Sequence, residues 1–145
     1  MSDGAPQFPF ESLEVYQLAR TFRRRVYKLA ECLPDVERFN LAAQIRSAAR
    51  SLTNNIAEGS GRYGFRDRVK FMHQARGSLT ELMDDIVICE DQGYAQPDHL
   101  ATLRPGAVHL YRAISAYVRY LREKRTGTEK PKPAGAAAEP EAPAR

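Results

Sequence analysis

Apolar side chains recur along most of this chain at steps of three and four residues, a spacing that places them on one face of an α-helix. The most regular stripe, with the alternation typical of coiled-coil packing, is Met72, Ala75, Leu79, Leu82, Ile86 and Cys89. Three further stripes are Val15, Leu18, Phe22, Val26, Leu29 and Leu33; Leu41, Ile45, Ala48, Leu52 and Ile56; and Leu100, Leu103, Ala107, Leu110, Ile114, Tyr117 and Leu121. The pattern predicts four amphipathic helices that share one core.

Residues that start and stop helices predict the boundaries of the first two. Ser12 is a good N-cap for the first helix, which should end at Leu33 because Pro34 follows. The second helix should begin near Phe39 and end at Glu58-Gly59. Gly59 can adopt the left-handed conformation that caps a C-terminus, so we expect it to stop this helix.

Glycine and proline also delimit the second half of the chain. The third helix should follow the turn at Gly59 to Gly64 and end at Gly93, and the fourth should begin at Pro97. Pro105-Gly106 is expected to kink or split the fourth helix, because proline lacks a backbone N–H. Short links favour antiparallel neighbours, so the fold class predicted is an all-α, antiparallel, up-down four-helix bundle.

A single domain is expected for a chain of 145 residues. The bundle should occupy residues 11–125, after a flexible N-terminus over residues 1–10. Residues 126–145 are rich in Pro, Ala and Gly and contain no aromatic or large aliphatic side chain. Such a segment buries too little apolar surface to offset the entropy of ordering, so a disordered tail is predicted.

Charge is distributed unevenly among the expected helices. The whole chain carries a net charge of +4. The segments 12–33, 38–70 and 99–125 are basic, with net charges of +3, +5 and +5, whereas residues 71–98 carry a net charge of −5. Basic surfaces can attract phosphates, and the acidic helix could line a subunit contact; a mixed, solvated surface is the alternative.

The second helix bears two polar lines beside its apolar stripe. One is Arg46, Arg50 and Asn54, and the other is Ser47, Ser51 and Asn55, each at i, i+4 spacing. The arginine line either meets an anion or is a solvated face, and the small line either forms a contact between subunits or lets a neighbouring helix approach. Gly77 and Ser78, inside the third helix, also suggest the close approach of another helix.

Three segments, in this order and at these separations, carry a family resemblance: PFESLEVYQLA at 9–19, QIRSAARSLTNNIAEGSGR at 44–62 and ARGSLTEL at 75–82. The chain resembles the bacterial four-helix-bundle proteins first named for the intervening sequences of large-subunit ribosomal RNA. It is similar, more distantly, to the accessory variability proteins of diversity-generating retroelements. Thr53 stands where the family usually has proline, a departure expected to change helix stiffness more than chemistry.

The resemblance implies a non-enzymatic bundle that assembles as a homopentameric ring. It also implies nucleic-acid binding, mainly in the retroelement branch, so RNA, DNA and a reverse transcriptase are the possible partners. No cofactor is expected. The candidate nucleic-acid-binding residues are Arg23, Arg24, Arg46, Arg50, Arg62, Arg66, Arg68, Lys70, Arg119 and Arg122. The candidate interface residues are Ser47, Ser51, Asn55, Gly77, Ser78 and Glu81.

An enzyme is the less favoured alternative. Arg66 or Arg68 followed by His73 matches the Arg-x(4–6)-His spacing of HEPN ribonucleases, but Arg104 and His109 match it too, and chance produces such pairs readily. Tyr63 and Phe65 lie among basic residues and could stack on bases, or Phe65 could belong to the core with Tyr63 at the surface. No catalytic residue is assigned.

Neither a metal site nor a membrane span is predicted. No Glu-x-x-His pair of a di-iron bundle occurs, and GSGRYG at 59–64 lacks the lysine of a phosphate-binding loop. Cys32 and Cys89 are expected to be buried and reduced. There is no apolar run of transmembrane length and no signal peptide, so the cytoplasm is the expected compartment.

Overall fold

The computed structural model describes residues 4–125, which form four long helices and two short 3-10 turns. The long helices are α1 (Glu14–Cys32), α2 (Leu41–Ser60), α3 (Phe65–Gln92) and α4 (Pro97–Arg125). The 3-10 turns are η1 (Pro9–Ser12) and η2 (Asp35–Glu37). No strand occurs in the described part of the chain, so the prediction of an all-α protein with four helices is confirmed.

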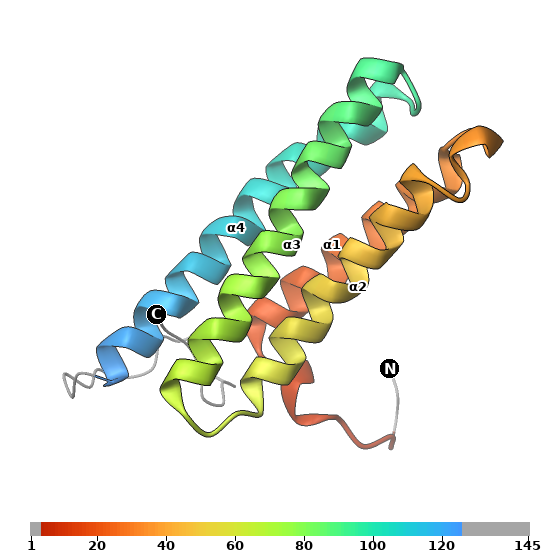
Figure 1. Cartoon of the computed structure of the whole chain (residues 1–145). Coiled ribbons are helices and arrows are strands. Elements are labelled where there is room, and N and C mark those ends of the chain that lie inside the picture. The colour runs from red at the N-terminus through yellow and green to blue at the C-terminus, as the bar shows by residue number, and fades with distance from the viewer. Residues whose placement is uncertain (1–3, 126–145) are drawn as a thin grey trace.

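Successive helices run in opposite directions and pack as neighbours, as expected of an up-down bundle (Figure 1). α2 packs on α1 and on α3, α4 packs on α3 and on α1, and the backbones of the diagonal pairs stay farther apart than those of neighbours. The α1–α2 and α3–α4 links lie at one end of the bundle, and the α2–α3 turn lies at the other (Figure 1). No helix within residues 4–125 is long and apolar enough to cross a membrane.

The apolar stripes face the common core as predicted in three of the four helices. Every residue of the stripes of α2, α3 and α4 is buried. In α1 the stripe is displaced: Leu18 and Leu33 are only half-buried, and Tyr16, Ala19 and Ala30 are buried instead. Buried alanines let α1 approach its neighbours closely, a role that counting only large side chains overlooks.

Gly59 does not stop α2 in a left-handed conformation, contrary to the prediction. It lies within the helix, which continues to Ser60, and Gly93 is the only left-handed glycine that caps a long helix among the described residues. A Cβ on Gly59 would lie 2.7 Å from the Phe71 Cβ and 2.9 Å from the Met72 Cε. Glycine is therefore required here for the close approach of α2 to α3.

The start of α1 and the course of α4 also differ from expectation. Ser12 ends η1 instead of capping α1: Leu13 takes the N-cap position, and the Ser12 hydroxyl donates to the Pro9 carbonyl. Pro105 does not split α4, which is one continuous helix. Pro105 is exposed, so the carbonyl that loses its helical donor can be hydrated.

The small polar line of α2 serves the contact between α2 and α3. The Ser51 and Ser78 hydroxyls are 2.8 Å apart, and the Asn55 amide donates to the Ser51 carbonyl at 2.8 Å. Gly77, in contrast, is exposed, and nothing lies within 4 Å of a Cβ built on it. Inside one subunit, therefore, close approach explains Ser78 but not Gly77.

Hydrogen bonds join the two helix links at the upper end of Figure 1. The Tyr94 hydroxyl donates to the Glu37 carboxylate at 2.7 Å, and the same carboxylate accepts the Leu41 N–H at the start of α2. The Tyr94 hydrogen bond is the main reason that the pKa of Glu37 is lowered. Arg104 forms a two-pronged ion pair with Glu90 at 2.6 and 2.7 Å, which fixes α4 to the end of α3.

Candidate nucleic-acid interface

The first half of α3 presents a row of basic side chains to solvent. Arg66, Lys70 and His73 follow one another at about one turn and line a single shallow depression, together with Asp67. At a rise of about 1.5 Å per residue, the distance from Arg66 to Arg76 is about 15 Å along the axis. Each strand of a duplex advances by about 3.4 Å along the axis per phosphate, so the row is long enough to meet several phosphates.

Arg76 extends this row and is held in place on three sides. Its guanidinium donates to the Ser115 hydroxyl of α4 at 2.9 Å and to the His73 Nδ1 at 3.0 Å. It also lies 5.4 Å from the ring centre of Tyr111. A guanidinium that is fixed before an anion arrives loses less conformational entropy when it binds one.

The contact with Arg76 also sets the state of His73. A guanidinium can only donate, so the His73 Nδ1 must accept, and the proton of a neutral imidazole then resides on Nε2. Partial burial lowers the pKa of His73, and the nearby positive charges of Arg76 and Arg122 lower it further. The imidazole is thus neutral near pH 7 and has an N–H to donate.

We define the α3–α4 basic face as Arg66, Lys70, His73, Arg76, Arg119 and Arg122. Arg122 lies close enough to act on the charge of His73, and Arg119 follows Ser115 by one turn. Within residues 4–125 none of these arginines or Lys70 forms an ion pair with a carboxylate. The face therefore has a cationic charge that no acidic side chain of the same described chain neutralises by contact.

A second group of basic side chains lies on α1 and α2. Arg24 and Arg50 are exposed, and Arg46 lines a cavity at the α1–α2 link. Arg23 is different, because it donates to the Thr53 hydroxyl at 2.8 Å. Thr53 is 2% exposed, so the residue that departs from the family pattern adds a buried polar contact between α1 and α2, beyond the change in stiffness that we expected.

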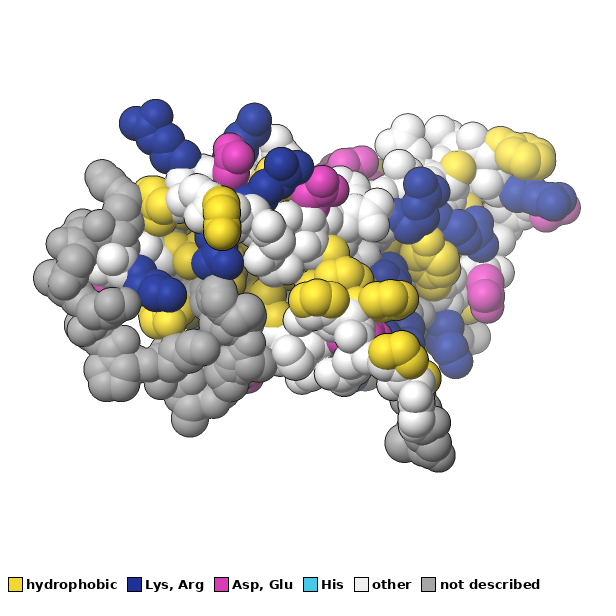
Figure 2. Space-filling model, turned by 90° about the horizontal axis from the view of Figure 1, so that it is seen from below, with side chains coloured by type: hydrophobic (Ala, Val, Ile, Leu, Met, Phe, Trp, Pro, Cys, Tyr) yellow, Lys and Arg dark blue, Asp and Glu magenta, His cyan; other side chains and the backbone are white. Residues whose placement is uncertain are grey.

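Basic side chains are therefore spread over more than one surface. In the view from below, Lys and Arg side chains form separate groups, with hydrophobic side chains between them (Figure 2).

Two other candidates, Arg62 and Arg68, make structural contacts at the α2–α3 turn. Arg68 donates to the Arg62 carbonyl at 2.8 Å and to the Ser60 carbonyl at 3.4 Å, at the carbonyl-rich end of α2. Arg62 pairs with Glu58 at 3.0 Å and lies over the ring of Phe71. Of the two aromatic residues nearby, Phe65 packs against the core and Tyr63 is fully exposed.

The second half of α3 is acidic and contains a buried carboxylate. Asp85 is 7% exposed, and its Oδ2 has no hydrogen-bond partner in the described part of the chain. Burial, together with the charges of Glu81 and Asp84, raises the pKa of Asp85 to about 6. Such a group destabilises the folded subunit at neutral pH unless a cation or donor reaches it.

The interface candidates occupy two kinds of position. Ser51 and Ser78 meet between α2 and α3, Asn55 donates to Ser51 within α2, and Ser47, Gly77 and Glu81 are exposed. The cysteines differ too, since Cys89 is buried as predicted and Cys32 is exposed, contrary to the prediction. Burial raises the pKa of the Cys89 thiol to about 11, so it is protonated at neutral pH.

Three Arg–His pairs have the ribonuclease spacing, and in two of them the arginine is engaged elsewhere. Arg68 is turned toward the end of α2, and Arg104 is paired with Glu90, so neither reaches a histidine. Only Arg66 lines the same depression as His73. Residues 4–125 contain no group of three or more His, Cys, Asp and Glu side chains that could hold a metal ion.

Arg76 is the residue that the sequence analysis missed. It lies in segment 71–98, whose net charge is acidic, so it belongs to none of the basic segments. It also follows His73 by three residues, whereas the Arg-x(4–6)-His spacing requires an arginine before the histidine. The available signal was the i, i+3 relation between His73 and Arg76, which places the two side chains on one face of a helix. Ser115 and Tyr111 could not be found without knowing how α3 and α4 pack.

No curated protein matches the chain. A family model described as 23S rRNA-intervening sequence protein matches residues 11–116, which cover α1, α2, α3 and most of α4. This family is not a known enzyme family. The match spans most of the chain and agrees with the three sequence motifs and the four-helix fold, and the chain belongs to the 23S rRNA-intervening sequence protein family.

Proposed function

We propose that this protein is a non-catalytic, oligomeric four-helix bundle that binds RNA or an RNA–DNA hybrid through phosphate contacts. Its role would be that of an accessory or scaffold factor for another protein, such as a reverse transcriptase. The observation that carries the proposal is the α3–α4 basic face, where a fixed Arg76 and the neutral His73 lie among cations that have no carboxylate partner within residues 4–125. The family name, which refers to ribosomal RNA, supports an association with RNA.

The composition of the face favours phosphate contacts over reading of bases. Its side chains are arginine, lysine and an imidazole N–H, all donors suited to phosphate oxygens, and they come from two helices packed side by side, α3 and α4, so that no single helix carries the whole face. Contacts of this kind position a protein on nucleic acid without specifying sequence. We also propose that the protein is a homopentamer. One nucleic acid could then meet several copies of the face, and the weak contacts would combine through avidity.

A salt titration with matched charge variants tests this proposal. We expect Lys70→Gln/Arg122→Gln to weaken binding of a labelled RNA hairpin by about tenfold at low salt and to lower the slope of log K against log salt by one to two, roughly. Arg24→Gln/Arg50→Gln removes the same charge from the α1–α2 surface and should have a smaller effect. Equal losses in both variants would show that net charge, and not this face, drives binding.

A second candidate function is a purely structural or protein-interaction module. It is favoured by one specific observation: Asp85, beside Glu81 and Asp84, is buried with an Oδ2 that has no hydrogen-bond partner within residues 4–125. In this alternative, arginines of an adjacent subunit neutralise the acidic half of α3. The mass in solution at low and high salt tests this alternative. An assembly held by ion pairs dissociates at high salt, whereas an assembly held by apolar faces persists.

A further inference from the structure

The link between α1 and α2 exposes an aromatic ring beside a pair of arginines. Phe39 is 86% exposed and Val36 is 80% exposed, large fractions for apolar side chains. The guanidinium of Arg38 lies 5.1 Å from the centre of the Phe39 ring. Arg38 also lines the cavity at the α1–α2 link that Arg46 lines, so the exposed ring lies next to this cavity.

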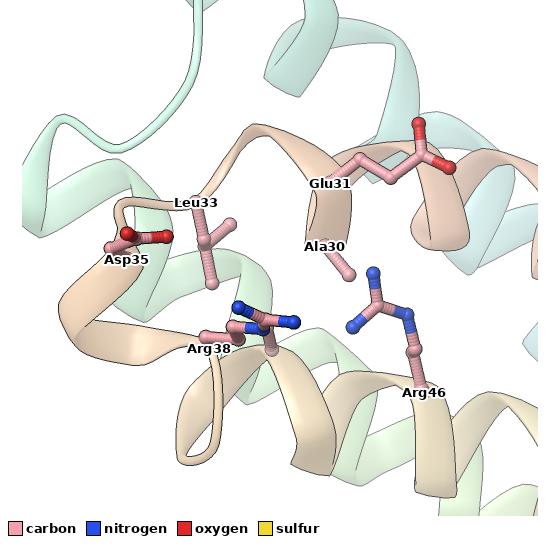
Figure 3. A pocket seen from close by; sticks show the side chains of 7 residues that line it. Ala30, Glu31, Leu33, Asp35, Arg38 and Arg46 are labelled. Carbon is pink, nitrogen blue, oxygen red and sulfur yellow. The ribbon is translucent and has the colours of Figure 1, made fainter.

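That cavity has a volume of about 260 Å³ and a floor of small side chains, Ala30 and Ala42. Figure 3 shows the guanidinium groups of Arg38 and Arg46 pointing toward one another, while the Glu31 carboxylate points away from both. Neither arginine forms an ion pair with a carboxylate of residues 4–125. Two facing guanidinium groups repel each other unless an anion lies between them.

We propose that this tip binds one unpaired nucleotide of a single-stranded RNA segment, with a phosphate between Arg38 and Arg46 and the base stacked on Phe39. The inference rests on the proposed nucleic-acid function and adds the class of nucleic acid and a separate site for it. Base stacking on an aromatic ring requires an unpaired base, which a continuous duplex does not offer.

Stacking on Phe39 favours a nucleotide over an acidic peptide. Glu31 and Asp35 belong to the lining of the cavity, and because the Glu31 carboxylate points away from both guanidinium groups (Figure 3), Asp35 is the one of the two placed to accept a hydrogen bond from a ribose hydroxyl or a base amino group. The carboxylate of an acidic peptide would satisfy the arginines, but it offers no planar ring to stack on Phe39 and leaves that ring in water.

The chain contains no tryptophan, so Phe39→Trp introduces a single fluorescent reporter at the proposed stacking position. We expect a single-stranded RNA oligonucleotide to quench this tryptophan and a blunt RNA duplex of the same sequence to leave it nearly unchanged. Val36→Trp, at the same tip, is the matched control and should be quenched less. Adding Arg46→Gln to the Phe39→Trp variant should raise the RNA concentration needed for half-maximal quenching by about tenfold.

Binding of the same labelled RNA, followed by its anisotropy, separates the two proposals. Binding without quenching of the tryptophan at position 39 would overturn the nucleotide site and leave the nucleic-acid function intact, whereas absence of binding to this RNA and also to the RNA hairpin would overturn both. A blue shift that grows with protein concentration in the absence of RNA would identify the tip as a contact between copies and would also overturn the site. Circular dichroism of each variant verifies that the helices are retained.

Discussion

The two halves of α3 share one core stripe and differ in everything that faces outward. Residues 65–78 carry four basic residues and one acidic residue, whereas residues 79–92 carry five acidic residues and no basic one. In the first half, Arg76 is partly buried and fixed by neighbours; in the second, Asp85 is buried and its Oδ2 has no hydrogen-bond partner within residues 4–125. A single continuous helix thus presents a basic surface in one half and an acidic surface in the other, and its core stripe does not indicate which half is which.

The largest effect is expected from breaking the stripe that both halves share. Leu79 is fully buried where the two halves meet, and Leu79→Ala should lower the free energy of unfolding by about 2–5 kcal/mol, through lost burial and the cavity left behind. Urea unfolding measures this. Thr80→Ala, one position along and exposed, is the control and should change stability by less than about 1 kcal/mol.

The acidic half is expected to limit the stability of the single subunit. The folded pKa of Asp85, about 6, lies above the ordinary value of 3.8, so protonation stabilises the fold. Stability should therefore rise as the pH falls from about 6 to about 4. Asp85→Asn should remove this pH dependence and raise the free energy of unfolding at pH 8 by about 1–2 kcal/mol, measured by urea unfolding.

Asp84→Asn, at an exposed neighbouring position, is the comparison for this measurement; because the Asp84 charge also raises the pKa of Asp85, it should raise stability at pH 8 by less than Asp85→Asn and leave the pH dependence in place. The opposite result for Asp85→Asn, a loss of stability at pH 8 together with a smaller mass in solution, would mean that a cation from another copy pairs with Asp85. That outcome would favour the protein-interaction alternative.

A smaller effect is expected at Gly77, near the boundary between the halves. Because nothing lies close to a Cβ at this position, Gly77→Ala should stabilise the helix by about 0.5–1 kcal/mol. Thermal unfolding and mass in solution should be measured together. If Gly77→Ala caused the assembly to dissociate, Gly77 would be a contact between subunits. The sequence-based expectation that another helix approaches closely at Gly77 would then hold between subunits.

No effect on RNA integrity is expected from the basic half. His73→Ala should weaken RNA binding slightly, because it removes one donor and a neighbour of Arg76. The wild-type protein and His73→Ala should both leave RNA uncut. Gel analysis of a labelled RNA after prolonged incubation measures this. Cleavage by the wild-type protein that His73→Ala abolishes would reinstate the ribonuclease alternative.

The fold could be predicted well from the sequence because burial follows the helical period. Every residue predicted for the stripes of α2, α3 and α4 is buried, and Ala42, Ala49 and Val118 are buried in addition. Errors arose where a residue has two physical uses. Gly59 was assigned to a left-handed cap but serves close packing against Phe71, and Ser12 was assigned to a cap but ends a 3-10 turn. Period alone does not choose between such uses.

The candidate interface was less predictable, because it depends on contacts between helices. Sequence identified Arg66, Lys70 and Arg122 as basic, but only the packing of α3 on α4 shows that they flank His73 and Arg76. The same packing assigns Arg23 to Thr53 and Arg68 to the end of α2. An arginine's charge is visible in sequence; whether a neighbour already occupies its donors is not.

Pro105 gives α4 an uneven resistance to local opening. The missing N–H removes one rung of the hydrogen-bond ladder between the first two turns of α4 and the rest, so we expect backbone amides of residues 97–104 to exchange with solvent faster than those of residues 110–121. The ion pair of Arg104 with Glu90 then acts as a clasp on this segment. Detachment of the first turns of α4 from α3 would break this charge pair and expose the buried Leu100 and Leu103, and salt would accelerate it through the charge pair alone.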